Sequence, residues 1–499
     1  MTAHLAQIGY AGPRRTVGAA AFSGIMATIG VVVFWGFTVD DALITARVAH
    51  HISLGQGYRF NSHGPVVDAV TPLGWAYILA PFAKSGPIGT LLVARWIGVV
   101  AWIASASWLG ANVARHRSAI WPLALLAIHA PLGLWASAGM ETPVVTALVT
   151  FATAEGVAGS CCLGIAAAWR PELIPYALVM AVGRCRSLSK IPRELAIVVI
   201  PVIVTMLVRW AGFGSPQPLA VFAKPADLSH GFWYALEALL WCGPIWLWLA
   251  SGWPWSEVTT SAALDDQRRP ATRWLGSLGA LPGLPRLERY ELTMVVAVLV
   301  HFAAIGLAGG DWMPAYRLAV PVMPVMLRVA CQIASGRGRL LATAAIILAT
   351  TSTLRIAIKL APAARLVLAQ RLELIRGASR ALSKASVVAA PDVGWVGAAF
   401  PGEVVDLAGA TDPTIAHLKG GHTSKRIGIR LLLSRRVDRV IVLLAAPAQV
   451  SVPWTDSPFA RAIDYRAALL AADLDCSPTA RLDLPHTDQA YLVLGCPRQ

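Results

Sequence analysis

Eleven apolar runs, separated by polar loops, constrain this chain more than any other feature. They lie near residues 18–37, 72–83, 87–108, 119–138, 142–158, 161–181, 194–211, 232–250, 291–308, 318–334 and 340–358. A helix of about 20 apolar residues is long enough to cross the hydrocarbon core of a bilayer. The chain is 56% hydrophobic and only 14% charged, and a soluble protein of this size could not bury so much apolar surface. The runs therefore predict an α-helical polytopic membrane protein with about eleven transmembrane segments.

The basic residues are concentrated in loops between these runs. Arg14 and Arg15 precede the first run, and further basic clusters lie within 182–193, 251–290 and 337–339. Basic loops remain on the cytoplasmic side of a membrane, so the N-terminus is expected in the cytoplasm. The same count places loops 38–71, 212–231 and 309–317 outside. The basic loop 111–118 also falls outside, against the rule. Either a short run such as 72–83 is re-entrant, or this loop is an exception.

A net charge of +15 in a soluble protein would suggest a nucleic-acid partner. Here the charge fits membrane topology and anionic lipid headgroups better. The sequence contains no basic helix, zinc-ligand spacing or aromatic strand motif that would indicate nucleic-acid binding. Membrane lipid is therefore the expected partner of the basic loops, and nucleic acid is not.

Hydropathy falls after residue 358, and this change divides the chain. Residues 1–358 form the predicted transmembrane module, 359–384 a basic amphipathic connecting helix, and 385–499 a small α/β domain on the outer face. Short β-like runs at 386–390, 404–407, 437–444 and 491–494 support that domain. Cys476 and Cys496 lie within it. In an oxidising compartment they could form a disulfide, and two unpaired thiols are the alternative interpretation.

Asp40 and Asp41 follow the first apolar run directly, at the expected outer face of the membrane. Ile44, Val48 and Ile52 recur every four residues, so residues 40–54 predict an amphipathic helix lying on the membrane surface. One acidic residue would be enough to cap such a helix. The second carboxylate remains available for chemistry, as a general base for example.

Several motifs occur in the order found in a known family. They are Asp-Asp-Ala-Leu-Ile-Thr-Ala-Arg at 40–47, Leu-Gly-Gln-Gly-Tyr-Arg-Phe-Asn at 54–61, Val-Asp-Ala-Val-Thr-Pro-Leu-Gly-Trp at 67–75, Ser-Ala-Gly-Met-Glu-Thr at 137–142, Trp-Arg-Pro-Glu at 169–172, Gln-Pro-Leu-Ala-Val-Phe-Ala-Lys at 217–224, Gly-Gly-Asp-Trp-Met-Pro-Ala-Tyr-Arg at 309–317, Asp-Val-Gly at 392–394 and Val-Asp-Leu-Ala-Gly-Ala-Thr-Asp-Pro at 405–413. Together they resemble the GT-C membrane glycosyltransferases, and within them the actinobacterial terminal β-1,2-arabinofuranosyltransferase group. The resemblance covers most of residues 35–415.

The resemblance implies transfer of a sugar, with inversion, from a polyprenyl-phosphate donor to a glycan or glycolipid acceptor outside a bacterial plasma membrane. A pentofuranose is one candidate for the sugar. Asp40 is the favoured general base, with Asp41 orienting an acceptor hydroxyl or a cation, and the two roles are interchangeable. Lys224 and Arg317 are the candidates for binding the donor phosphate. The sequence identifies no cofactor with certainty, and a divalent cation at Asp40 or Asp41 is an open alternative.

The remaining candidates have substrate-binding or structural roles. Asp68, Asp311, Trp75 and Trp312 are candidates for substrate binding, and Trp395 for stacking on a sugar ring. Glu141 is expected near the inner face, away from the chemistry, and Arg170 and Glu172 are expected to pair structurally. Two other functions remain as alternatives. A transporter or flippase would have ionisable residues near mid-membrane in two related halves, and a non-catalytic scaffold would bind glycan through its outer domain.

Overall fold

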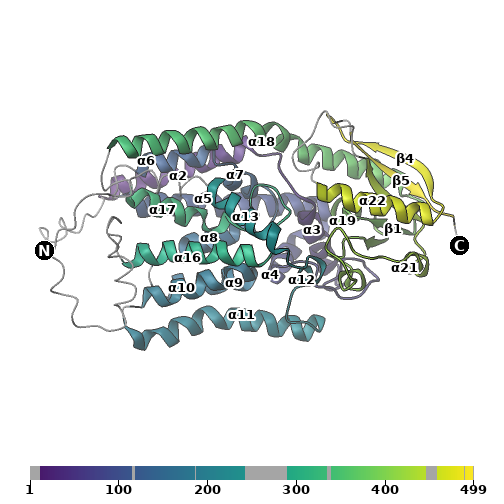
Figure 1. The fold of residues 1–499 in the computed structure, drawn as a ribbon, viewed down its shortest axis with the longest axis horizontal. Coiled ribbons are helices and arrows are strands. Elements are labelled where there is room, and N and C mark those ends of the chain that lie inside the picture. Colours follow the sequence, from purple (N-terminus) through teal and green to yellow (C-terminus); the bar gives the residue numbers. More distant parts are fainter. Residues whose placement is uncertain are drawn as a thin grey trace, which may run out of the picture.

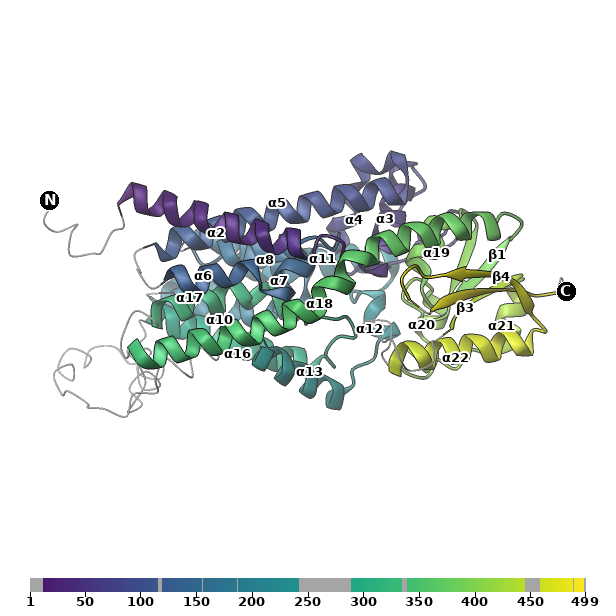
Figure 2. The same ribbon diagram turned by 90° about the horizontal axis from the view of Figure 1, so that it is seen from above.

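The computed structural model describes residues 12–114, 119–154, 156–185, 187–241, 289–333, 339–444, 458–487 and 489–497. Most helices run along the long axis of the molecule, and a smaller domain containing a sheet forms one end (Figure 1). The first described helix begins at the other end, and a view turned by 90° keeps the same division (Figure 2). We call these the domain end and the N-terminal end.

The helical part consists of segments that run back and forth between the two ends. Its α-helices are α2 (Pro13–Val33), α3 (Asp40–Ser53), α4 (Leu73–Leu79), α5 (Pro87–Val113), α6 (Ile120–Ala124), α7 (Ala130–Ala136), α8 (Thr142–Phe151), α9 (Val157–Trp169), α10 (Ile174–Arg184), α11 (Ile191–Phe213), α12 (Leu219–Ala223), α13 (Leu228–Trp241), α16 (Arg289–Leu307), α17 (Met323–Ile333) and α18 (Arg339–Ala381). Short 3₁₀ helices are η1 (Ala80–Ser85), η3 (Leu125–Ala127), η4 (Pro171–Leu173), η5 (Leu188–Lys190) and η7 (Val320–Val322).

Four of the described helices are long and apolar enough to cross a membrane: Pro13–Val33, Pro87–Val113, Leu188–Phe213 and Tyr290–Leu307. Shorter apolar helices accompany them at Thr142–Phe151, Val157–Trp169 and Val320–Cys331. Large apolar side chains of α11 point outward along much of its length, at Ile200, Ile203, Val204, Leu207 and Trp210. Such a surface is unfavourable in water and stable against lipid chains. These helices agree with the predicted multi-pass membrane protein.

The predicted span at 72–83 is wrong. This run forms α4 and η1, and both stay at the domain end against α3. Nδ1 of His50 in α3 lies 2.7 Å from the carbonyl oxygen of Ala83 in η1. One face of the run is buried in protein, where Trp75, Ala76 and Leu79 expose no surface, while Tyr77, Ile78 and Phe82 are exposed.

The position of α5 removes the conflict over loop 111–118. α5 begins at the domain end and runs to the first turns of α2, where Gly110 packs directly against the backbone of Ala19. The loop is therefore attached at the N-terminal end, beside Arg14 and Arg15. Residues 115–118 are outside the described part of the chain. This basic loop is thus attached at the same end as Arg14 and Arg15, as the positive-inside rule requires.

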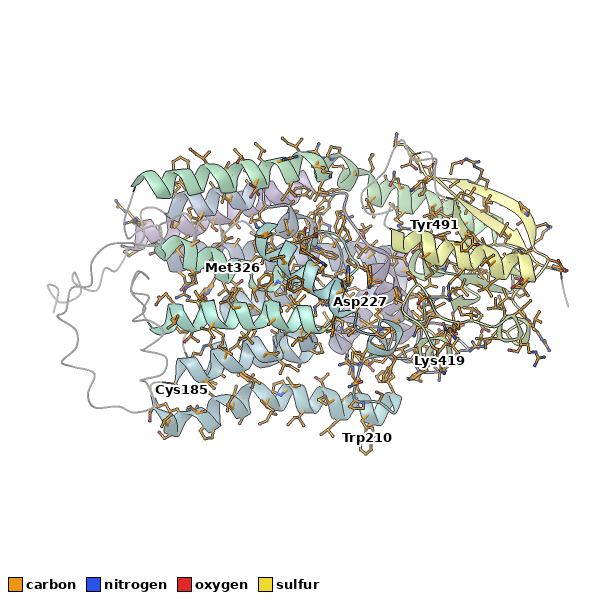
Figure 3. The ribbon with its side chains drawn as sticks, in the orientation of Figure 1. Cys185, Trp210, Asp227, Met326, Lys419 and Tyr491 are labelled. Carbon is orange, nitrogen blue, oxygen red and sulfur yellow. A yellow bond between two sulfur atoms is a disulfide. The ribbon has the colours of Figure 1, made fainter. Side chains whose placement is uncertain are left out.

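The run at 161–181 is a second correction, because it forms two helices instead of one span. α9 begins at the N-terminal end, where the hydroxyl of Ser160 donates to the carboxylate of Glu194 near the start of α11. It ends at Trp169, whose ring lies 6.3 Å from that of Trp75 at the domain end. α10 then returns to Cys185 at the N-terminal end (Figure 3). The segment 72–83 does not cross from one end to the other, and the segment around 161–181 crosses twice instead of once. These two changes cancel, so the loops after Cys185 lie at the ends that the sequence predicted.

α3 is a helix, as predicted, but it does not lie on a membrane surface with one face in water. Every residue from Ala42 to Ala49 is buried. η1 and α5 pack on one part of the helix, and α19 of the C-terminal domain packs on another. The periodicity of its apolar residues correctly indicated a helix. Its burial could not be predicted in the same way, because the domain that covers it lies more than 300 residues further along the chain.

α18 joins the helical part to the C-terminal domain without a break. It extends over 43 residues and contains Pro362, so the last apolar run and the predicted connecting helix 359–384 form one element. Its buried positions Ala357, Ala361 and Ala364 recur every three to four residues, the spacing of one helix face. The N–H of Leu368 donates to the carbonyl oxygen of Gly36, at 2.9 Å, which ties α18 to the segment after α2.

The C-terminal domain contains a five-stranded sheet in the order β2-β1-β3-β5-β4. Its strands are β1 (Val387–Ala390), β2 (Glu403–Asp406), β3 (Arg439–Leu444), β4 (Ser477–Asp483) and β5 (Ala490–Gly495), and its helices are α19 (Val393–Ala399), α20 (Pro413–Ala416), α21 (Ile429–Ser434) and α22 (Pro458–Asp473). β1 is parallel to β2 and β3, whereas β5 is antiparallel to β3 and β4. The small α/β domain is thus confirmed. β4 lacks an apolar pattern and was missed.

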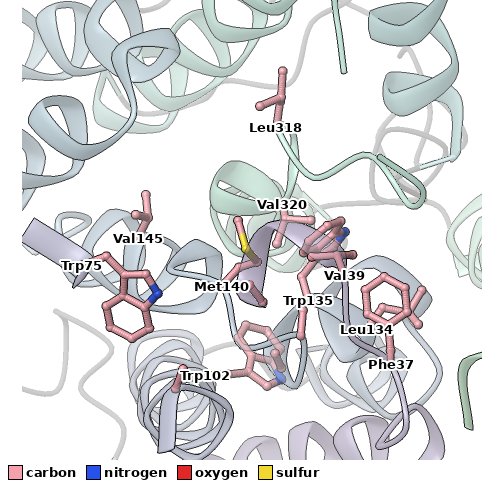
Figure 4. Packing of buried hydrophobic residues seen from close by; sticks show 14 of the residues in the cluster. Phe37, Val39, Trp75, Trp102, Leu134, Trp135, Met140, Val145, Leu318 and Val320 are labelled. Atoms are coloured by element: carbon pink, nitrogen blue, oxygen red, sulfur yellow. The ribbon is translucent and has the colours of Figure 1, made fainter. Parts of the chain in front are cut away.

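The buried core is continuous from the helices into the C-terminal domain. At its centre, Trp102 and Trp135 expose almost no surface and pack with Phe37, Met140 and Val320, which come from three other segments (Figure 4). In the domain, a disulfide joins Cys476 to Cys496, next to the first pair of residues in the β4–β5 ladder. The same core reaches the residues around α3.

Candidate active site

Asp40 and Asp41 begin α3, and their carboxylates bind different partners. Successive residues of a helix point about 100° apart. The carboxylate of Asp40 accepts backbone N–H bonds from Gly394 (2.6 Å) and Trp395 (2.9 Å), where α19 begins. Oδ2 of Asp41 lies 3.4 Å from Nη1 of Arg317. The structure therefore separates the pair into one carboxylate facing the C-terminal domain and one facing the loops of the helical part.

Asp40 lies in a cluster of polar groups where α3, α18 and the C-terminal domain meet. Burial raises the pKa of its carboxyl, and the charge of Asp392 raises it further. The positive charge of Arg371 and the hydrogen bonds from the amides of Gly394 and Trp395 lower the pKa, and the resulting value is about 7. The hydroxyl of Tyr491 donates to Oδ2 of Asp392 at 2.5 Å. With both oxygens occupied by N–H donors, Asp40 is well placed to join two domains.

Two further side chains at this junction bond to the backbone of the C-terminal domain. Arg47, which is 2% exposed, donates through Nη1 to the carbonyl oxygens of Gly397 (2.5 Å) and Phe400 (2.6 Å). The amide of Asn61 both donates to and accepts from the backbone of Val404, at 2.9 and 3.0 Å. We call Asp40, Arg47 and Asn61 the α3 clamp.

Asp41 retains an accessible carboxylate, because its side chain is 30% exposed. Burial raises its pKa, but the positive charges of Lys224 and Arg317 outweigh burial and bring the pKa below the ordinary value. Asp41 is therefore ionised at neutral pH. Arg317 is held by Asp311 through Nε (2.8 Å) and Nη2 (3.3 Å), which leaves Nη1 toward Asp41.

Lys224 supplies the least engaged positive charge near Asp41. It directly follows α12, and its N–H donates to the carbonyl oxygen of Ala220. Its side chain is half-buried. Among the described residues, no hydrogen bond or ion pair engages its ammonium group, so this charge is available to an anionic ligand.

His422 belongs to the site and was not predicted. It lies in a segment of the C-terminal domain, residues 417–428, that we call the 417–428 loop. Burial, and next the charge of Lys224, lower the pKa of its imidazole to about 3, so His422 is neutral at physiological pH. The motif resemblance ends before this loop. A single histidine after Gly420 and Gly421 has no catalytic or metal-ligand spacing that would have identified it.

The structure corrects the side assigned to Glu141. It lies at the domain end, where its Oε1 is 3.4 Å from Nη1 of Arg170, and its charge acts on Arg317. The predicted pair of Arg170 and Glu172 is confirmed, with Nε and Oε1 3.1 Å apart. The wrong side followed from counting 72–83 as a span. Glu141, which is itself paired with Arg170, therefore helps to stabilise the positive charge of Arg317.

The substrate-binding candidates occupy different surroundings. Asp68 is buried and paired with Arg209 of α11, with Oδ2 and Nε 2.7 Å apart. Trp75 and Trp395 expose no surface. Trp312 is 41% exposed, and its ring stacks on that of His230, with centroids 3.8 Å apart. Of these three tryptophans, Trp312 alone presents an accessible ring near Asp311 and Arg317.

The acid pair does not fit a divalent cation. Within the described ranges, no group of three or more His, Cys, Asp and Glu side chains lies close enough to hold a metal ion. Both oxygens of Asp40 already accept N–H bonds. Asp41 is surrounded by Lys224 and Arg317, which repel a cation and attract an anion.

The bundle of helices with a small terminal sheet agrees with the predicted fold class, a helical polytopic membrane protein with a small α/β domain at its C-terminus. The chain is similar in structure to ArnT from Cupriavidus metallidurans, solved bound to undecaprenyl phosphate, with a TM-score of 0.52 and 11% identity over 95% of this chain and 97% of that chain. No family model and no curated protein matches the sequence. The likeness extends to the fold and does not distinguish the arabinofuranosyltransferase group.

Proposed function

We propose that this protein is an inverting glycosyltransferase that moves a sugar from a polyprenyl-phosphate donor to a glycan or glycolipid acceptor. The observation that carries the proposal is the accessible carboxylate of Asp41 beside the available ammonium of Lys224, at one end of a membrane-embedded bundle. A cationic site at this position suits the phosphate of a lipid anchored in the bilayer. The structural likeness to ArnT, solved with undecaprenyl phosphate, supports the same donor class.

We assign the general base to Asp41, in place of the initially favoured Asp40. The acceptor hydroxyl attacks the anomeric carbon, the bond from that carbon to the phosphate oxygen breaks, and the hydroxyl proton passes to Asp41. The electron pair of the broken bond leaves with the polyprenyl phosphate, whose charge Lys224 and Nη1 of Arg317 stabilise. Binding of the donor phosphate also offsets these cations, which raises the pKa of Asp41 and makes it a better base.

We propose that the site faces the outside of a bacterial plasma membrane. α2 and α11 both begin at the N-terminal end, opposite the site (Figure 1). Their first turns and the short helix η5 before α11 contain Arg14, Arg15, Lys190 and Arg193, which supports a cytoplasmic position for that end. A disulfide in the C-terminal domain supports an oxidising compartment for the domain end.

The sugar and the acceptor are the finer parts of the proposal. A pentofuranose and a cell-envelope acceptor follow from the motif resemblance alone. Purified protein should release free polyprenyl phosphate from one member of a panel of polyprenyl-phosphate pentoses and hexoses. If no donor in the panel is consumed, and Asp41→Asn binds glycan as well as the wild type, the protein is a scaffold.

A further inference from the structure

Lys425, in the 417–428 loop, reaches out of the C-terminal domain and bonds to a helix of the other part. Lys425 is only 3% exposed. The ammonium donates to the carbonyl oxygens of Phe222 (2.9 Å), Ala416 (2.5 Å) and Leu418 (3.2 Å). An ammonium group has three N–H donors, so these three acceptors complete its hydrogen bonding.

Phe222 lies in α12, two residues before Lys224. The last carbonyl groups of a helix have no partner within it, and a lysine ammonium can satisfy one of them. The ring of Phe222 also stacks on that of His417, with centroids 4.6 Å apart and planes inclined by 29°. α12 is therefore fixed to the C-terminal domain by a polar and an aromatic contact.

The backbone around Lys425 is itself held from a second direction. Nη1 of Arg466 in α22 donates to the carbonyl oxygen of Lys425. The N–H of Arg426 donates to the carbonyl oxygen of Lys419 at 2.9 Å, which closes the 417–428 loop. These bonds fix the backbone that carries the Lys425 side chain. A displacement of α12 would therefore break the hydrogen bond from the Lys425 ammonium to the carbonyl oxygen of Phe222.

We propose that Lys425 is a positioning residue that holds α12 in place and thereby sets Lys224 for binding the phosphate of the lipid-linked donor. The proposal rests on the proposed function for its ligand, and on the geometry alone for the fixing of α12. The 417–428 loop contributes His422 to the surroundings of Asp41 as well. The C-terminal domain is then part of the donor site instead of a separate module.

The first test measures binding of undecaprenyl phosphate to the full-length protein in lipid nanodiscs. Lys425→Met removes three hydrogen bonds to buried carbonyls and should weaken binding about tenfold. Lys425→Arg keeps the charge and donors and should restore most of the affinity. Lys419→Met, at an exposed position of the same loop (Figure 3), should bind like the wild type. If Lys425→Met binds normally while Lys224→Met is weakened, the proposal is overturned.

The second test does not depend on any ligand. Hydrogen exchange of the amides of residues 219–224 should be faster in Lys425→Met than in the wild type, and unchanged in Lys419→Met. Equal rates would refute the fixing of α12. If the wild type does not bind undecaprenyl phosphate, the proposed function fails, and hydrogen exchange alone decides the role of Lys425.

Folding of each variant is followed by its thermal unfolding midpoint. If Lys425→Met does not fold, Lys425→Gln replaces it, because its amide can still donate to one or two of the carbonyls. In the activity assay, Lys425→Met should raise KM for the lipid donor more than it lowers kcat. A general loss of structure would lower the amount of active enzyme and leave KM unchanged.

Discussion

Two of the contacts between the C-terminal domain and the helical part, one at α3 and one at α12, differ in how their charges are used. In the α3 clamp, Asp40, Arg47 and Asn61 all bond to backbone groups of the domain. Around α12, the domain bonds through Lys425, while Lys224 and part of Asp41 remain accessible. Charges at the first contact are satisfied internally, and charges at the second are left for a ligand.

This difference assigns separate roles to two acids that are adjacent in sequence. Asp40 contributes to the fixed contact and Asp41 to the open one. A carboxylate that is already bonded gives rigidity, and one with accessible oxygen and nearby cations can react. Variants at the two contacts should therefore affect different measurements, and four predictions test this, beginning with the largest effect.

Asp41→Asn should cause the largest loss. Removing the general base should lower kcat by about 10²- to 10⁴-fold, while asparagine keeps the size of the side chain. The measurement is release of polyprenyl phosphate at saturating donor, with circular dichroism to confirm folding. Turnover within a factor of about three of the wild type would remove Asp41 from the mechanism.

Lys224→Met should affect donor binding more than chemistry. Loss of the available ammonium should raise KM for the lipid donor by about tenfold or more, with a smaller change in kcat. Lys419→Met is the matched control, since it removes a lysine from an exposed position nearby. A lowered kcat with an unchanged KM would indicate that Lys224 acts only in the transition state.

Asp40→Asn should act on stability, with a defined pH dependence. The folded pKa of Asp40, about 7, is above its ordinary value of 3.8, so the folded protein binds this proton more tightly than the unfolded chain does. Its contribution to stability is therefore complete below about pH 4 and is lost as pH rises through 7. The asparagine variant lacks this dependence and should unfold about 4 °C lower at acidic pH. A parallel shift of both proteins between pH 5 and 8 would contradict the assignment.

Replacing Cys476 and Cys496 by serine should have the smallest effect on catalysis. The disulfide closes a loop of 20 residues, and its loss should destabilise the domain by about 3 kcal/mol. Proteolysis of the β4–β5 region should become faster while donor KM stays the same. A change in KM would mean that this edge of the sheet communicates with the site.

The sequence anticipated which candidate residues lie near one another better than it anticipated their surroundings. The acid pair, Lys224 and Arg317 were predicted because charged residues in outer loops are few. The run 72–83 was misassigned because hydropathy cannot distinguish burial in protein, as at Trp75, from burial in lipid. The side of Glu141 was wrong for the same reason. His422 and Lys425 act through contacts between distant segments, which no local pattern encodes.

α18 has a mechanical consequence. At about 1.5 Å per residue, its 43 residues extend about 65 Å, roughly twice the hydrocarbon thickness of a bilayer. Because α18 is one long rod, a tilt of its N-terminal part displaces the sheet that follows its C-terminal end. Bending of this rod would change the position of the sheet relative to the other helices. Pro362, near the middle of the rod, is where such bending would concentrate.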